Sequence, residues 1–253
     1  MARVLAIHAH PDDLETLAAG TLALLVAAGH EVIIATLTAG DCGSVSLSRE
    51  ETARVRRSEA TRAAAIIGAP YHCLGLPDLG VFIDDATRRH VTEFIRQKRP
   101  DIIVTAAPAD YHPDHEATSA LVRDGGFAAS VPNYQTGRAA PLSAPPHLYF
   151  TDPIGGRAPD GQKIIPDFAV DIGTTFEVKR RMLAAHESQT AWLAHQHHLD
   201  DPVAAMASLS RRRGEEYCAT YAEGFRHYRG EPFPRTPWLQ ELLGPAVLAA
   251  RPV

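Results

Sequence analysis

Short apolar runs alternate with amphipathic segments through the first half of this 253-residue sequence. The apolar runs are short enough for buried strands, and the longer segments repeat apolar residues at helical spacing and stop at glycine or proline. The predicted strands are residues 4–9, 32–37, 71–74 and 101–106. The predicted helices are residues 13–28, 48–67 and 86–98. This alternation predicts an α/β fold, a Rossmann-like, doubly wound, mostly parallel sheet with helices on both faces.

The pattern changes in the second half of the chain. Residues 125–146 are rich in Pro, Gly, Ala and Ser and predict a long loop, of the kind that often walls an active site. We expect later strands at 147–151 and 168–172, a helix capped by Thr174 and Glu177, and a helical tail over 202–228. Because no repeat or composition shift marks a boundary, residues 1–253 are predicted to form a single domain.

Composition narrows the class of protein. The formal net charge is −5, and Lys and Arg are scattered, so nucleic acid is not an expected partner. The run Arg211-Arg212-Arg213 is interpreted as a solvated helix end. Three cysteines are too few for a disulfide framework, no export signal begins the chain, and the apolar run 17–28 is too short to cross a bilayer. These features predict a cytoplasmic protein without a membrane partner.

Two histidine-carboxylate motifs carry the candidate chemistry. His10-Pro11-Asp12-Asp13 follows the first predicted strand, and His112-Pro113-Asp114-His115 follows the fourth. In open parallel sheets ligands bind beyond the carboxyl ends of the strands, so we expect the two motifs to meet there. His10, Asp13 and His115 would then bind a divalent ion, with one coordination position left open for chemistry. Zn²⁺ is the expected cofactor, and Fe²⁺ or another divalent ion is also compatible with these ligands.

The remaining motif residues are candidate catalytic groups. Asp12 is placed to act as general base on a metal-activated water. His112, oriented by Asp114, could act as an acid or stabilise an oxyanion. A plainer interpretation exists for each motif alone, because Asp12 and Asp114 could be helix N-caps. Two motifs at matching strand ends make that interpretation much weaker, and His8 is expected to pack or to support a ligand.

Two other classes of protein are alternatives to a metal-dependent hydrolase. A dinucleotide-binding domain needs a glycine-rich turn after the first strand, whereas Asp12, Asp13 and Glu15 here would repel a pyrophosphate. A non-haem iron oxygenase shares the ligand set of two histidines and one carboxylate. The doubly wound pattern disfavours the oxygenase.

On these motifs the chain resembles the PIG-L/LmbE-like zinc-dependent N-deacetylases, which remove acetyl groups from N-acetylglucosamine units of small glycoconjugates. Weaker matches in family order are Thr38-Ala39-Gly40-Asp41, Arg56 with Glu59, Leu76-Pro77-Asp78, His186-Glu187-Ser188-Gln189 and Tyr221-Ala222-Glu223-Gly224-Phe225. The resemblance implies the same ligands and catalytic residues, and a homo-oligomer, a trimer or hexamer. The chain departs from many relatives in having Leu14 before Glu15, which makes Glu15 a helix residue more than a catalytic one.

Substrate contacts are harder to predict. By resemblance Arg56 lies near the substrate, with a surface arginine as the alternative. Asp41 and Asp78 follow strands and could bind sugar hydroxyls or only form turns, and Tyr111 could face the substrate. A second metal is a minor alternative to solvent exposure for the histidines of the 186–198 segment, which are His186, His195, His197 and His198.

The sequence therefore predicts a zinc-dependent hydrolase that removes an N-acetyl group from an N-acetylglucosamine-type amino sugar or small glycoconjugate. A metal-dependent hydrolase of another N-acyl or ester substrate is the alternative, since the same water could attack either bond. A zinc-binding protein without catalysis is the third reading. It is disfavoured because Asp12, His112 and Asp114 accompany the ligands.

Overall fold

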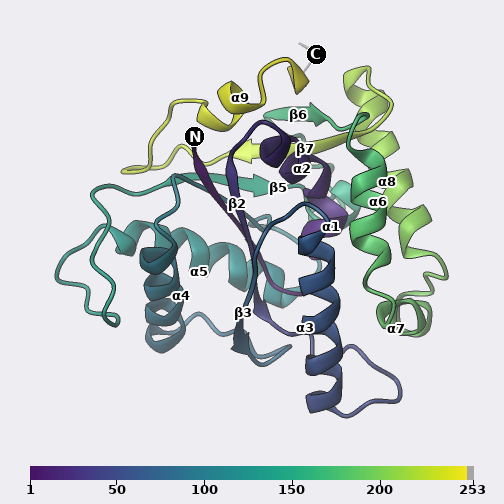
Figure 1. Ribbon diagram of the computed structural model, residues 1–253, viewed down its shortest axis with the longest axis horizontal. Coiled ribbons are helices and arrows are strands. Elements are labelled where there is room, and N and C mark those ends of the chain that lie inside the picture. Colours follow the sequence, from purple (N-terminus) through teal and green to yellow (C-terminus); the bar gives the residue numbers. More distant parts are fainter. Residues whose placement is uncertain (250–253) are drawn as a thin grey trace.

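The computed structural model describes residues 1–249, in which eight strands form one mixed sheet (Figure 1). Their order across the sheet is β3-β2-β1-β4-β5-β7-β6-β8. The strands are β1 (Arg3–His8), β2 (Glu31–Thr38), β3 (Tyr71–Leu76), β4 (Ile102–Thr105), β5 (His147–Thr151), β6 (Phe168–Asp171), β7 (Ala222–His227) and β8 (Val247–Ala249). Strands β1 to β5 run parallel, while β7 is antiparallel to β5 and β6 and β8 is antiparallel to β6. The predicted mostly parallel sheet is confirmed.

Helices cover both faces of this sheet, as predicted. They are α1 (Asp13–Leu17), α2 (Ala19–Ala27), α3 (Arg49–Ala65), α4 (Asp85–Lys98), α5 (Pro113–Ala129), α6 (Phe176–Ala184), α7 (Gln189–His197), α8 (Pro202–Tyr217) and α9 (Trp238–Leu243). Figure 1 shows α4 and α5 together on one side, and α1, α3 and α6 on the other. Within residues 1–249, no helix combines the length and the apolar character needed to cross a membrane.

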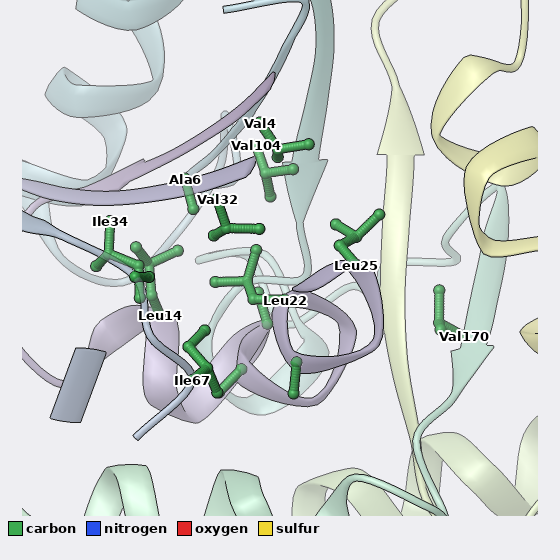
Figure 2. Close-up of a cluster of buried hydrophobic side chains, with 14 of the residues drawn as sticks. Val4, Ala6, Leu14, Leu22, Leu25, Val32, Ile34, Ile67, Val104 and Val170 are labelled. Atoms are coloured by element: carbon green, nitrogen blue, oxygen red, sulfur yellow. The ribbon is translucent and has the colours of Figure 1, made fainter. Parts of the chain in front are cut away.

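Successive side chains of the central strands lie on opposite faces of the sheet and pack into two separate hydrophobic cores. Val4 and Ala6 of β1 pack with Leu14 and Leu22 of α1 and α2, in the cluster drawn in Figure 2. The intervening Leu5 joins the other core, which includes residues from α4 and α5. Both faces of a central strand are therefore buried, which explains why these strands are continuous apolar runs without polar alternation.

The strand order reverses at β1, and this reversal positions the two histidine motifs. The chain passes from β1 outward to β2 and β3, then returns to the other side of β1 to form β4. Ile7 near the end of β1 is paired with Thr105 at the end of β4. Because the two strands are parallel and adjacent, the loops after them leave the same edge side by side, where the strand order opens a crevice.

Two predicted boundaries in the second half were wrong. The loop predicted over 125–146 starts later, because α5 continues through Gly125 and Gly126 to Ala129. A Cβ on Gly125 would lie 3.1 Å from Val91 and 3.3 Å from Ile95, so Gly125 allows α4 and α5 to pack closely, while Gly126 packs against Phe233. The tail predicted as helix over 202–228 is helical only to Tyr217, and its end forms the central strand β7.

Two predicted helices also differ from the helices in the structure. The segment 13–28 is broken at Ala18 into α1 and α2, and α6 begins at Phe176 without the Thr174 and Glu177 capping box. In contrast, the capping box of Ser48 and Glu51 at the start of α3 is present. The break has a physical reason in Glu223 of β7, whose carboxylate accepts hydrogen bonds from the amides of Gly20 (2.9 Å) and Thr21 (2.8 Å). These are amides of the first turn of α2, which have no partner within the helix.

Glu223 also forms a fully buried ion pair with Lys179 of α6, at 2.6 Å. We predict that Glu223→Gln lowers the free energy of unfolding by about 3–5 kcal/mol, because it leaves a buried ammonium without its counter-charge. Urea unfolding would measure this loss. Glu177→Gln, on the exposed side of the same helix α6, is the matched control and should change stability by less than about 0.5 kcal/mol. Equal effects of the two substitutions would show that the buried pair does not stabilise the fold.

Candidate metal centre

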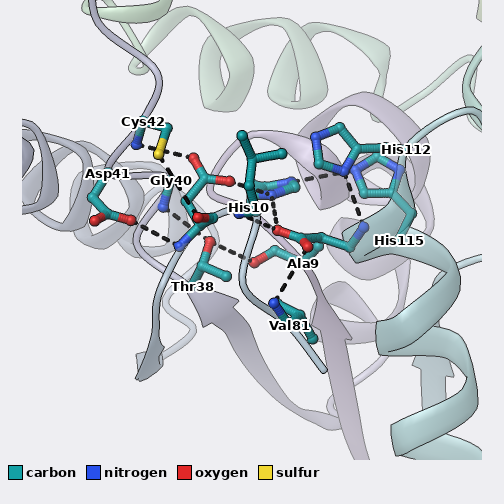
Figure 3. Close-up of polar contacts among 12 residues, drawn as sticks. Ala9, His10, Thr38, Gly40, Asp41, Cys42, Val81, His112 and His115 are labelled. Atoms are coloured by element: carbon teal, nitrogen blue, oxygen red, sulfur yellow. Dashed lines mark hydrogen bonds and ion pairs between the residues drawn. The ribbon is translucent and has the colours of Figure 1, made fainter. Parts of the chain in front are cut away.

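The two histidine motifs meet in one buried cluster, as expected from the strand order. Three donor groups form a nearly equilateral triangle. His10 Nδ1 lies 3.3 Å from His115 Nε2 and 3.3 Å from Asp13 Oδ2, and His115 Nε2 lies 3.3 Å from Asp13 Oδ1. Figure 3 shows the rings of His10, His112 and His115 turned toward a common point.

This spacing fits a small divalent ion. Donors bound at 2.0–2.1 Å in tetrahedral geometry lie about 3.3 Å apart, and two imidazoles with one carboxylate are a common catalytic zinc set. Three further groups that share a residue with this triangle also meet the distance requirement for a metal site, namely His10 with His112 and His115, His8 with Asp13 and His115, and His10 with Asp78 and Asp114. The residues present therefore fit a divalent cation held by His10, Asp13 and His115.

Polar contacts on the side away from the triangle hold two of these donors in place. Asp13 Oδ2 accepts from the backbone amide of His10 at 2.7 Å and lies 2.7 Å from His8 Nδ1. The far nitrogen of His115, Nδ1, lies 3.1 Å from the carboxylate of Asp110. A carboxylate behind a ligand histidine fixes the ring and its tautomer, which leaves the other nitrogen free to bind metal. Asp110 was not identified from the sequence, because it belongs to neither motif.

The carboxylates of two aspartates contact His10, which the sequence did not predict. His10 Nε2 lies 3.1 Å from Asp78 Oδ1 and 3.3 Å from Asp114 Oδ2. The Asp114 carboxylate also accepts from the amide of Leu79 at 2.7 Å. The prediction that this carboxylate orients His112 is therefore replaced by a contact with His10. Asp78, predicted to bind sugar hydroxyls, is occupied by His10 and by the Cys42 amide.

The carboxylates create a strongly negative environment around the triangle. Although burial lowers it, the charges of Asp13 and Asp110 raise the pKa of His115 to about 9. Burial also opposes protonation of His10, but hydrogen bonds to Asp114, Asp13 and Asp78 hold its pKa well above the ordinary value. The same field would favour a divalent cation, whose binding would release protons from these imidazoles.

Asp12 lies beside the triangle in an unusual backbone conformation. Its φ of 90° is in the left-handed region, which non-glycine residues rarely adopt and which is found at functional sites. Burial raises the pKa of Asp12 to about 6; the Arg56 guanidinium opposes this rise, and the Asp13 carboxylate adds to it. A carboxyl group with this pKa is matched to proton transfer near neutral pH.

Arg56 supports this loop from the wall of the cavity. Its side chain is buried and donates to the carbonyl oxygens of Gly40 (2.9 Å) and Pro11 (2.7 Å), and to Asp12 Oδ2 (3.1 Å). A Cβ on Gly40 would lie 1.9 Å from the Arg56 guanidinium, so the close approach requires glycine. Arg56 also lines the cavity over the triangle, so a substrate contact by Arg56 stays a prediction, whereas the surface alternative is wrong because the side chain is buried.

His112 caps α5 and has a defined tautomer. Its Nδ1 accepts a hydrogen bond from the backbone amide of Asp114 at 3.2 Å. Burial lowers the pKa of His112 to about 4, with the nearby charges of His10 and His115 adding to the effect. The ring is thus neutral at pH 7 with its hydrogen on Nε2, and it can donate a hydrogen bond but is a poor proton source.

The other predicted site residues divide between the cavity and its support. Tyr111 is 54% exposed, with its ring 5.7 Å from that of His112, at the mouth of the site. The Asp41 carboxylate accepts hydrogen bonds from the Arg49 side chain and from the Asp78 amide. These bonds stabilise the loop. Of the histidine-rich segment, His186 is buried against Glu15 at 3.4 Å and His197 reaches the site, while His195 and His198 are exposed.

A polar cavity of about 310 Å³ lies over the triangle. His10, Asp12, Asp13, His112 and His115 form its floor, and residues of α7 form the opposite wall. α7 was not predicted from the sequence. It is fixed to α3 through Glu59, which accepts from the amide and the hydroxyl of Ser188 at 2.8 and 2.6 Å.

Comparison with known proteins agrees with this site. Residues 5–125 match the model of the PIG-L family, described as GlcNAc-PI de-N-acetylase. The chain is 28% identical over 244 residues to the diacetylchitobiose deacetylase of Thermococcus kodakarensis, covering 90% of this chain and 84% of the relative. The structure of N,N'-diacetylchitobiose deacetylase from Pyrococcus horikoshii matches with a TM-score of 0.77 at 25% identity, covering 94% and 88% of the two chains. The chain is therefore similar to the PIG-L/LmbE-like deacetylases in sequence and in structure.

The chain is also similar to a protein that is named for a different activity. The 4-oxalmesaconate hydratase of Pseudomonas putida is 25% identical over 183 residues, covering 69% of each chain. The reaction of this chain therefore has to be argued from its own residues.

Asp110 provides a test of the metal centre. We predict that Asp110→Asn weakens binding of a divalent ion by about 10- to 100-fold, because the amide no longer fixes and polarises His115. Titration of the ion-free protein with Zn²⁺ against a competing chelator would measure the dissociation constant. Asp124→Asn, further along α5 and paired with Arg88 and Arg123, should leave it unchanged. An unchanged affinity in Asp110→Asn would exclude His115 as a ligand.

Proposed function

We propose that this protein is a zinc-dependent hydrolase that removes the N-acetyl group from an N-acetylglucosamine-type sugar or small glycoconjugate. The observation that carries the proposal is the triangle of His10, Asp13 and His115, with Asp12 and His112 beside it. Two imidazoles and one carboxylate with an open position are typical of catalytic zinc. The deacetylase names of the relatives support the substrate class.

The ion, when bound, would polarise the acetamide carbonyl and lower the pKa of a water. Residues of the protein then carry out the proton transfers. Asp12 accepts a proton from the attacking water, which its raised pKa of about 6 permits near neutral pH. Arg56 holds the carboxylate in place through its bond to Asp12 Oδ2.

His112 is assigned to the developing oxyanion. Its Nε2 hydrogen can donate to the carbonyl oxygen as that oxygen gains negative charge. When the carbon–nitrogen bond breaks, Asp12 returns its proton to the departing amine, and acetate and the free amino sugar leave. Asp114 contributes by fixing His10 with its carboxylate and His112 with its backbone amide.

Location and assembly are also part of the proposal. The cytoplasm is proposed because three cysteines in 253 residues suit a reducing compartment. A homo-oligomer, trimer or hexamer, is proposed from the family resemblance alone.

The zinc-loaded protein should release acetate and free amine from N-acetylglucosaminides. Asp12→Asn should reduce turnover by about 10²- to 10⁴-fold without loss of bound zinc, because it removes the base but no ligand. Acetate assay together with metal analysis would measure both quantities, and chelation should abolish turnover of the unaltered protein. Hydration of a conjugated acid without any acetate release would instead assign the chain to the hydratase activity of its other relative.

The pH dependence of kcat/KM should report Asp12. A base must be deprotonated to act, so activity should rise with pH through about 6 and be lost below it. Arg56→Gln removes a positive charge that lowers the pKa of Asp12, and should therefore move this limb to higher pH. Rates measured at saturating zinc, with bound metal checked at each pH, separate this effect from loss of the ion. A limb that moves to lower pH in Arg56→Gln would contradict the assignment of the base.

A further inference from the structure

A second hollow adjoins the candidate active site. It has a volume of about 700 Å³ and lies against α6, α7 and α8, the group of helices at the right of Figure 1. We refer to it as the apolar groove, because its wall is largely aliphatic. Its apolar side chains are Ile154, Leu183, Leu193, Leu199, Met206 and Leu209.

The apolar groove is continuous with the polar cavity over the triangle. Asp12, Asp13, Tyr111, Leu193 and His197 line both hollows. A molecule that places its acetamide at Asp12 can therefore extend directly into the groove. Catalytic groups shared by two hollows indicate one extended binding site.

The apolar wall of the groove is partly open to solvent, although Met206 and Leu183 within it are buried. Within residues 1–249, none of the six belongs to a hydrophobic cluster that packs around the sheet. Leu193, Leu199 and Leu209 are only partly buried, whereas the strand side chains of the cores are fully buried. Apolar surface of this extent at a catalytic cleft is typical of a ligand site.

The apolar groove is long enough to hold an extended alkyl or aryl group. Pro202, Ala205, Leu209 and Arg212 follow one another along the same face of α8 and all line it. Ten residues of helix separate the first from the last, which corresponds to about 15 Å. A sugar ring would find few hydrogen-bond partners against such a wall, whereas an alkyl or aryl group would gain from burial.

We propose that the substrate carries an apolar substituent on its amino sugar, and that this substituent binds in the apolar groove. This inference rests on the proposed function, because it places the amide that is hydrolysed at Asp12. The substituent could be attached at the glycosidic oxygen or be part of a longer N-acyl chain. The shared chemistry is an apolar group of up to about 15 Å.

Two pairs of substrates test the proposal and separate the attachment points. The first pair is methyl and octyl N-acetylglucosaminide, and the second is N-acetyl- and N-octanoylglucosamine, all below their micelle concentrations. Each buried methylene contributes roughly fourfold, so kcat/KM should rise at least about tenfold for the octyl or the octanoyl member. A preference in the first pair assigns the glycosidic position, and a preference in the second assigns the N-acyl chain. A ratio near one in both pairs overturns the proposal.

Neighbouring alanines of α8 provide a matched pair of variants. Ala205 lines the groove and Ala204 is exposed on another face. Ala205→Trp should fill the groove and bring the preference for the long substrate toward one, while Ala204→Trp should retain it. Leu209→Ser is a second variant that removes apolar wall without adding volume, and should also reduce the preference. Equal loss in Ala204→Trp and Ala205→Trp overturns the assignment of the groove.

Calorimetry separates failure of this inference from failure of the proposed function. If no substrate is hydrolysed, the proposed function is wrong, and binding of octyl against methyl glucosaminide still tests the groove. Binding at least about tenfold tighter for the octyl compound, lost in Ala205→Trp, supports an apolar site. Equal binding of the two compounds overturns it even where acetate is released.

Discussion

The buried carboxylate of Asp13 is the interaction on which the site depends. It is only 7% exposed, and its two oxygens face His8, His10 and His115. Burial raises the pKa of a carboxyl group, yet the pKa of Asp13 lies well below its ordinary value, with the neighbouring His115 and His8 as the main opposing cause. The negative charge is therefore retained in the interior, where it stabilises cations at the same point.

The backbone at the end of β1 is arranged around that charge. Asp13 begins α1, and its carboxylate turns back to accept from the amide of His10 at 2.7 Å. This closes a tight loop that forces Asp12, one residue earlier, into left-handed geometry. Arg56 bonds the Pro11 carbonyl and the Asp12 carboxylate from outside the loop. The base and the ligand thus point in different directions from adjacent positions, which one loop of regular conformation could not provide.

The sequence allowed the sheet, the two motifs and the ligand triangle to be predicted, because strand ends and residue types are local signals. It did not indicate where long side chains point. Arg56 and Asp78 have the chemistry of sugar-binding groups, but tertiary packing directs both toward the protein's own loops. Strand β7 was missed for a similar reason, since its partners β5 and β6 are distant in the sequence and decide its conformation. Gly125 and Gly126 suggested a loop, although Gly125 permits close packing of α4 and α5 and Gly126 packs against Phe233.

Several carboxylates around the site already bond to other groups of the protein, and this limits how the substrate can be bound. Asp41, Asp78, Asp110 and Asp114 all bond to the protein's own groups. These contacts engage most of the carboxylates near the triangle, and the ring of Tyr111, which is 54% exposed, lies at the mouth. Orientation at the reacting carbon then comes from Asp12 and His112, whereas affinity has to come from contact area. In such a site polar groups fix the geometry and apolar walls supply binding energy, which is the division expected of a small-molecule pocket.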